Sequence, residues 1–139
     1  SSEWVVDQER INSTHSAILV QGESQGLRFA DLTAGDKIDF TAVADNNTLA
    51  EDTNGLGAGI SLSSSSTLAN YLDQAAVAST GASTAILKWF QYSGDTYMVI
   101  DNSNTTSYVS GTDTVVKATG LVDLSSSTVD ASGDLLTIV

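Results

Sequence analysis

The stretch "ILKWFQYSGDTYMVI", residues 86–100, decides the fold class. It contains two runs rich in aromatic and β-branched residues, which are the residue types that strands favour. Ser93, Gly94 and Asp95 join the two runs, and a three-residue connection that contains glycine predicts a β-hairpin. Apolar residues fall on both faces of each run, so we expect the hairpin to lie in the centre of a sheet rather than at its edge.

Most of the remaining chain has the pattern of further short strands separated by Gly, Asp, Asn and Ser. In "DKIDFTAV", residues 36–43, the apolar Ile38, Phe40 and Ala42 alternate with polar residues, which indicates a half-buried strand. Residues 44–66 are polar and rich in glycine and serine. We expect this long segment to form a surface loop.

One segment departs from the strand pattern. In "TLANYLDQAAVA", residues 67–78, apolar residues recur at helical spacing and alanine favours a helix, while Ser66 or Thr67 is suited to cap its first turn. The sequence therefore predicts a mainly β fold. We expect a β-sandwich or a β-roll-like sheet of short strands, with one short helix over about 67–78, in a single domain that spans residues 1–139.

The chain is strongly acidic, with 17 Asp and Glu against 5 Lys and Arg and a formal net charge of −12. We expect no nucleic-acid partner, because phosphate binding requires a cationic face. Repulsion among so many carboxylates destabilises a compact state, and bound divalent cations would relieve it. No segment approaches the roughly 18 apolar residues of a transmembrane helix, so we expect no membrane insertion. An N-terminal signal peptide is not visible either.

The residues offer little support for catalysis. Cysteine is absent from the sequence, which removes thiol catalysis and thiolate zinc sites together. His15 is the sole histidine and lies in a polar, turn-like context, and "GASTA" at residues 81–85 lacks the final glycine of a nucleophile elbow. The acidic residues occur in turns rather than beside clustered aromatic residues that would hold a sugar. We therefore expect that the protein is not an enzyme.

Four predicted strands begin with a glycine and an aspartate close together, in "AGDKIDF", "SGDTYMV", "SGTDTVV" and "SGDLLTI". Turn chemistry explains any one of them, because glycine supplies positive φ and aspartate accepts hydrogen bonds from nearby amides. Calcium binding is the alternative explanation, since the ion takes roughly six to eight oxygen ligands from carboxylates, amides, backbone and water.

The densest group of such oxygens follows the second strand of the predicted hairpin, in "DNSNT", residues 101–105. Asp95 and Asp113 stand at the ends of neighbouring strands, and we expect folding to bring them to the same edge of the sheet. The spacing does not complete an EF-hand. The candidate calcium ligands are therefore Asp95, Asp101, Asn102, Asn104 and Asp113, with Asp36 and Asp39 as a second pair. Solvated turns remain the other interpretation of both groups.

Three segments, "LTAGDKIDFTAV" (32–43), "KWFQYSGDTYMVIDN" (88–102) and "SGTDTVVKATGLVDLS" (110–125), resemble the C-terminal region of calcium-dependent RTX-type and S-layer-like bacterial surface proteins exported by type I secretion. The final residues, Asp134 to Val139, are similar to the acidic and hydrophobic tails that serve those proteins as uncleaved secretion signals. The glycine-rich nonapeptide repeat of calcium-bound β-rolls is absent in intact form.

The resemblance implies a calcium-binding, extracellular structural module at the bacterial cell surface. Its expected partners are copies of itself, in a surface layer, sheath or filament, and the type I secretion machinery. The alternative is a folding cap and secretion domain of a larger RTX-type enzyme or adhesin. A glycan-binding module is a third class, with only the aromatic hairpin in its favour.

Overall fold

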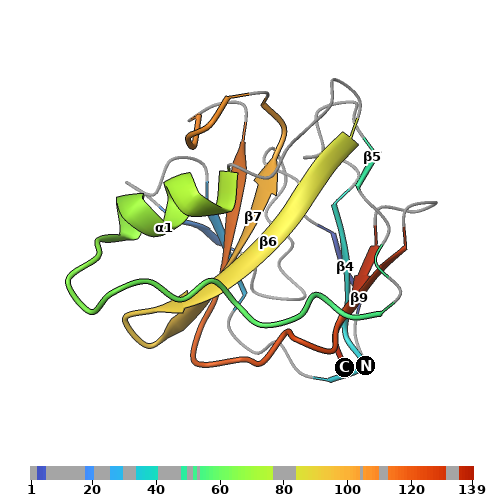
Figure 1. Cartoon of the computed structure of the whole chain (residues 1–139). Coiled ribbons are helices and arrows are strands. Elements are labelled where there is room, and N and C mark those ends of the chain that lie inside the picture. Colours follow the sequence, from blue (N-terminus) through green and yellow to red (C-terminus); the bar gives the residue numbers. More distant parts are fainter. Residues whose placement is uncertain are drawn as a thin grey trace.

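The computed structural model of the chain describes residues 3–5, 18–20, 26–29, 34–40, 48–49, 52, 54–76, 84–103, 105–109, 113–130 and 135–139. These residues form short strands and one short helix (Figure 1), so the predicted mainly β fold is confirmed. The elements are β1 (Glu3–Val5), β2 (Ile18–Val20), β3 (Gly26–Phe29), β4 (Lys37–Asp39), β5 (Thr48–Leu49), α1 (Leu68–Ala75), β6 (Thr84–Tyr92), β7 (Asp95–Asp101), β8 (Thr114–Ala118), β9 (Thr128–Asp130) and β10 (Leu135–Thr137).

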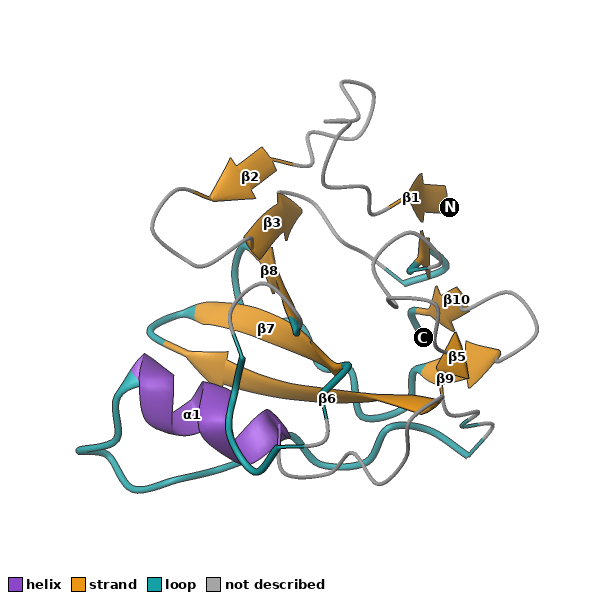
Figure 2. Cartoon of the chain, turned by 90° about the horizontal axis from the view of Figure 1, so that it is seen from above, coloured by secondary structure: helices purple, strands orange, loops and turns teal. Residues whose placement is uncertain are grey.

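The described strands form two sheets that pack as a small sandwich. One sheet has the order β1-β4-β10-β9, and the other has the order β2-β3-β8-β7-β6-β5. The antiparallel β6–β7 pair is the longest among the described strands, and β8 continues the sheet antiparallel to β7. Figure 2 shows α1 beside β6 and β7, on the side of the larger sheet that faces away from β9 and β10. Since β6 and β7 each have a neighbouring strand on both sides, the predicted central position of the hairpin is confirmed.

The connection between β6 and β7 is tighter than the sequence predicts. β6 ends at Tyr92 and β7 begins at Asp95, so only Ser93 and Gly94 form the turn. Both residues have positive φ, 52° and 86°. Such a two-residue turn matches the twist of an antiparallel pair, and it makes Asp95 the first strand residue rather than part of the loop.

Apolar side chains are buried on both faces of the larger sheet, as the two runs of the hairpin predict. One face contributes Leu87, Trp89 and Met98 to a core that includes Ile38 and Leu136 of the smaller sheet. The opposite face contributes the residues under α1, namely Phe90, Tyr97, Val99 and Val115, which pack with Tyr71 and Ala75. The central sheet is thus covered by the second sheet on one side and by the helix on the other.

The helix begins and ends close to the predicted bounds. Thr67 is its N-cap: its side chain accepts from the Asn70 amide at 3.2 Å, and the Asn70 side chain accepts from the Thr67 amide at 2.9 Å. This reciprocal capping box satisfies two donors that a helix start leaves free. Ala76 is the C-cap, so the helix is Leu68–Ala75, and residues 77–78 of the predicted helix lie outside the described part of the chain.

The half-buried strand predicted over residues 36–43 is confirmed in its described part, because Ile38 and Phe40 are fully buried while Lys37 is exposed. The C-terminal residues form β10, which pairs with β4 on one side and β9 on the other. Leu136 and Ile138 are buried there. The end of the sequence is therefore an interior strand of the smaller sheet.

The described residues of the predicted surface loop 44–66, namely 48–49, 52 and 54–66, take part in more backbone pairing than a loop would. They include β5, an isolated antiparallel bridge from Asp52 to Val129, and a parallel bridge from Ile60 to Phe90. The segment 54–62, which begins after the first bridge and contains the second, bonds to both sides of the sandwich, and we call it the strap. The Leu56 amide donates to the Ser127 carbonyl at 3.0 Å, and the Trp89 indole donates to the Gly57 carbonyl at 2.9 Å. Backbone hydrogen bonding, which side-chain patterns do not reveal, converts a polar segment into a connection between sheets.

Replacing Gly55 by alanine is expected to destabilise the strap more than the same change at Gly57. A Cβ at Gly55 would stand 2.7 Å from the Ser125 carbonyl oxygen, whereas at Gly57 nothing lies within 4 Å. Both glycines have positive φ, so each variant carries a left-handed cost of about 1–2 kcal/mol, and the backbone clash raises the total at Gly55 to about 2–4 kcal/mol. Urea unfolding measures both values, and equal losses would contradict the close contact.

Candidate functional site

Two of the predicted ligands, Asp101 and Asp113, meet at one end of the larger sheet. Asp101 is the last residue of β7, and Asp113 immediately precedes β8. The antiparallel register pairs Ile100 with Thr114, which places the two aspartates side by side. Both are fully buried, and the chain between them forms the polar loop that the sequence singles out.

The Asp113 carboxylate organises this loop. One of its oxygens accepts from the backbone amides of Asn102 at 2.7 Å and Ser103 at 3.0 Å. The other accepts from the Val109 amide at 2.8 Å and the Ser103 hydroxyl at 3.2 Å. A carboxylate offers about four lone-pair sites, so these donors occupy its hydrogen-bonding capacity. Asp113 therefore acts as the fixed point around which the loop folds.

Asp101 approaches the same serine. Its Oδ1 accepts from the Ser103 amide at 3.2 Å and lies 3.2 Å from the Ser103 hydroxyl, whose single hydrogen the Asp101 and Asp113 carboxylates share. Ser103 Oγ thus lies between two buried carboxylates, since it also contacts Asp113 Oδ2 at 3.2 Å. Asn102 follows Asp101 directly and contributes its amide to Asp113, whereas the predicted ligand Asn104 lies outside the described residues.

Tyr108 connects this loop to α1. Its amide donates to the Asp73 carboxylate of the helix at 3.0 Å, and its hydroxyl donates to the Asp113 carbonyl at 3.4 Å. Burial raises the pKa of Tyr108 to about 12, and the negative charge of Asp113 adds to the rise. The phenol therefore stays protonated well above neutral pH and remains a donor. Sequence analysis missed this residue because its role depends on contact with the helix.

Asp95 does not join Asp113, and the expectation that folding brings them to one edge is wrong. Asp95 begins β7 and Asp101 ends it. Because each strand residue advances about 3.3 Å, the two ends lie about 20 Å apart. The antiparallel register places Asp113 at the Asp101 end. The run "GDTYMVID" thus places one aspartate at each end of β7, and the two carboxylates belong to opposite ends of the sheet's strands.

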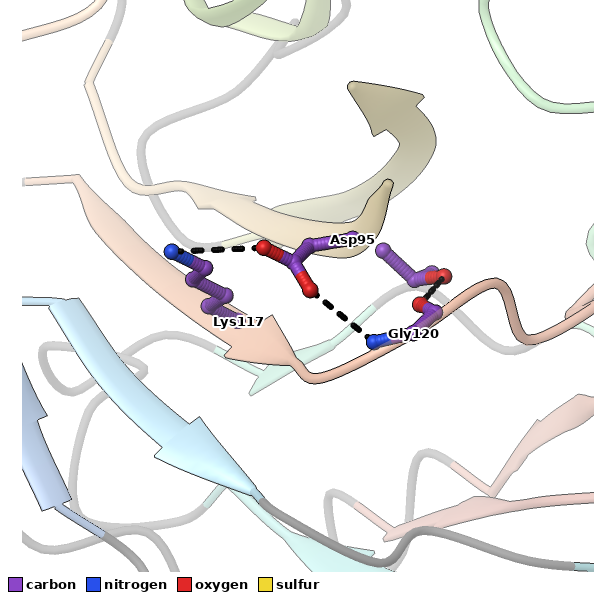
Figure 3. A network of polar contacts seen from close by, with 4 residues as sticks. Asp95, Lys117 and Gly120 are labelled. Carbon is purple, nitrogen blue, oxygen red and sulfur yellow. Dashed lines mark hydrogen bonds and ion pairs between the residues drawn. The ribbon is translucent and has the colours of Figure 1, made fainter. Parts of the chain in front are cut away.

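At its own edge, Asp95 holds the chain that leaves β8 (Figure 3). One carboxylate oxygen accepts from the Gly120 amide at 2.9 Å, and the other lies 3.5 Å from the Lys117 ammonium. The Lys117 ammonium also lies 5.7 Å from the centre of the Tyr97 ring. Asp95 and Lys117 are both largely shielded, so this pair fixes a turn at the sheet edge.

Thr96 strengthens the same edge and was not among the predicted residues. Its buried hydroxyl accepts from the Val122 amide at 2.8 Å and donates to the Gly120 carbonyl at 2.9 Å. Asp95 and Thr96 together bond the amides of Gly120 and Val122 and the carbonyl of Gly120. Gly120 has φ 85°, which marks a turn after β8. This glycine is the sequence signal that could have predicted a turn here, although it does not indicate that Asp95 and Thr96 hold the turn.

The second predicted pair is placed in the smaller sheet. Asp36 is buried, and its backbone carbonyl accepts from the Ile138 amide at 2.9 Å. The adjacent Gly35 has φ 92° and donates its amide to the Ile138 carbonyl at 2.8 Å. Asp39 lies in β4 between Val5 of β1 and Leu135 of β10. The backbone of Gly35 and Asp36 thus bonds the start of β4 to the residue that follows β10.

Among the described residues, no three side chains of the types Asp, Glu, His and Cys gather as a metal cluster. The closest arrangement is the pair Asp101 and Asp113 around Ser103, which brings two carboxylates and a hydroxyl together. His15 lies outside the described residues. The only described helix, α1, is too short to cross a membrane.

No protein-family model matches the chain, and the curated proteins include no detectable relative.

Proposed function

We propose that this chain is a non-catalytic structural module of the bacterial cell surface, stabilised by calcium and assembled with copies of itself. The observation that carries the proposal is the convergence of Asp101 and Asp113 on Ser103, inside a chain with a net charge of −12. Both carboxylates are fully buried. Gathering negative charge in this way is costly unless a positive charge lies nearby.

Calcium supplies that charge in the proposed function. Asp101 and backbone or hydroxyl oxygens of residues 101–109 would hold the ion, while Asp113 keeps the loop in place through the amides that it already accepts. The ion prefers such oxygen ligands and tolerates irregular geometry. Binding would add to the stability of the folded state only, because an unfolded chain does not bring these residues together.

The C-terminal residues would serve as the type I secretion signal in the same proposal. In the folded protein Leu136 and Ile138 are buried, and β10 is enclosed by two neighbouring strands. An export machine that reads this segment must therefore bind it before the domain folds. Calcium outside the cell would then favour the folded state after export.

Thermal unfolding with calcium, magnesium or a chelator tests the metal. Calcium at about 100 times its Kd adds about 2.7 kcal/mol, which corresponds to a rise of roughly 10 °C in Tm for a chain of this size. The rise should largely disappear in Asp101→Asn, which removes a buried charge but keeps the size of the side chain.

Asp123→Asn is the matched control, because Asp123 is exposed and lies in a different loop, where Ser125 lowers its pKa through hydrogen bonds. Its response to calcium should equal that of the native chain. A native Tm that is the same in calcium and in chelator would remove the metal from the proposal. An equal response in both variants would place the ion elsewhere.

A further inference from the structure

The charge of the protein is distributed very unevenly along the chain. Residues 53–94 contain one acidic residue, Asp73, and one basic residue, Lys88. The other 16 acidic and 4 basic residues lie in residues 1–52 and 95–139, so these two parts of the sequence carry the whole net charge, 4 − 16 = −12. A continuous stretch of 42 residues is therefore neutral in a highly acidic protein.

The fold gathers this stretch on one side of the molecule. Its described residues comprise the strap, α1 and β6, and Figures 1 and 2 both show the three elements on the same side. The Ile60 amide bonds to β6 at 2.9 Å, and the Leu62 amide bonds to the Tyr71 hydroxyl of α1 at 3.1 Å. We call this side the neutral face. Its exposed residues include Asn54, Ala58, Ser61, Ala69, Asn70 and Gln74.

We propose that the neutral face is the surface through which two copies of this chain meet, an inference that rests on the proposed self-assembly. Copies that carry −12 each repel one another over most approaches. Contact through the neutral face keeps the charged parts of both copies at the outside, where solvent ions screen them. A strongly cationic partner would instead seek the acidic surface, so the second copy is the occupant that the charge distribution favours.

The composition of the neutral face suits such a contact. The exposed Ala58, Ser61 and Ala69 are small and lose little conformational freedom when they are covered, whereas the exposed Lys88 and Asp73 carry the two opposite charges of this face. The strap and α1 are held by the capping box and by backbone hydrogen bonds, so the surface exists before the copies meet. Association therefore requires no rearrangement of the fold.

Introducing a charge on this face tests the inference. Ala58→Glu places a carboxylate on the strap, and Ala69→Glu places one on the exposed side of α1. Each should weaken self-association by about tenfold or more, because two copies bring like charges together. Ala34→Glu is the matched control, since Ala34 is exposed in the turn before β4, outside the neutral face. Sedimentation velocity over a concentration series measures the association, and Tm shows that each variant is folded.

The outcomes separate this inference from the proposed function. If the native chain associates and Ala34→Glu weakens this association as much as Ala58→Glu and Ala69→Glu do, the copies do not meet through the neutral face, although they still self-assemble. If the native chain remains monomeric with calcium and with NaCl, the proposed assembly fails and takes the inference with it. Raising NaCl from about 0.01 to about 0.15 M shortens the screening length and should strengthen the association. A weakening would mean that attraction between charges, not the neutral face, joins the copies.

Discussion

Asp113→Ala should destabilise the protein by about 3–5 kcal/mol, because it removes the carboxylate that accepts from the half-buried Asn102 and Val109 amides and leaves Ser103 with Asp101 alone as its carboxylate partner. Three amides and one hydroxyl converge on this carboxylate, which is fully buried. The alanine side chain cannot accept from any of them. A loss of this size is a large fraction of the stability of a small domain. Chemical denaturation with urea measures it, and amide exchange at residues 102–109 should rise together with it.

Asp113→Asn is the control that separates hydrogen bonding from charge. Asparagine keeps one acceptor oxygen, which can serve the Asn102 and Ser103 amides, but turns an NH2 group toward the Val109 amide. The free energy of unfolding of Asp113→Asn should lie between that of the native protein and that of Asp113→Ala. If Asp113→Ala is nearly as stable as the native chain, the loop is not organised around this carboxylate.

Phe90→Ala should cost about 3–5 kcal/mol, the range for removing a buried aromatic side chain. Phe90 is fully buried under α1. Its ring stacks between Tyr71, with centroids 4.9 Å apart, and Tyr97, with centroids 5.2 Å apart. The variant loses the contact that attaches the helix to β6 and β7. Near-UV circular dichroism of the tyrosines should weaken even under conditions in which the sheets remain folded.

Phe90→Leu provides the comparison. Leucine restores most of the buried volume but not the stacked ring, so it should recover more than half of the loss. Tyr92→Ala removes another aromatic residue near Tyr71, with centroids 5.6 Å apart, but from a half-buried position. A loss at Tyr92 equal to that at Phe90 would contradict the central position of Phe90 in this cluster.

The sequence predicts the elements that are determined by local patterns. Alternation identifies the strand around Ile38 and Phe40, and helical spacing with a capping residue at Thr67 identifies α1. The β6–β7 hairpin follows from two apolar runs around a glycine. In the strand around Ile38 and in the helix, burial follows a period of two or of 3.6, which a single sequence displays. The hairpin, in which β7 is buried on both faces, follows instead from its aromatic and β-branched composition.

Contacts between distant segments could not be predicted in the same way. The strap is polar and glycine-rich, and its order depends on backbone bonds to Ser125, Ser127 and Trp89. Side-chain patterns carry no record of which backbone groups pair. The same limit explains why the separation of Asp95 from Asp113 was not predicted. It depends on the register of β7 against β8, which places Asp113 at the Asp101 end of β7.

For the candidate site, the sequence singled out the loop at which Asp101 and Asp113 meet, but not the arrangement of that loop. Asp101 and Asp113 do meet, because they flank the same antiparallel connection. The sequence treated Asp113 as equivalent to its neighbours, whereas the structure surrounds it with amides. Calcium binding at this loop stays a prediction, and the unfolding experiment with Asp101→Asn is its test.

The positions of β1 and β10 also determine how the molecule responds to tension. Both strands flank β4, and Glu3 and Thr137 pair with the same residue, Lys37, so the two chain ends lie at one end of the sheet (Figure 1). A pulling force on these ends peels β1 and β10 from β4 one residue pair after another, rather than shearing all the bonds at once. Peeling requires little force, so the proposed fibre or layer would bear mechanical load through lateral contacts between subunits.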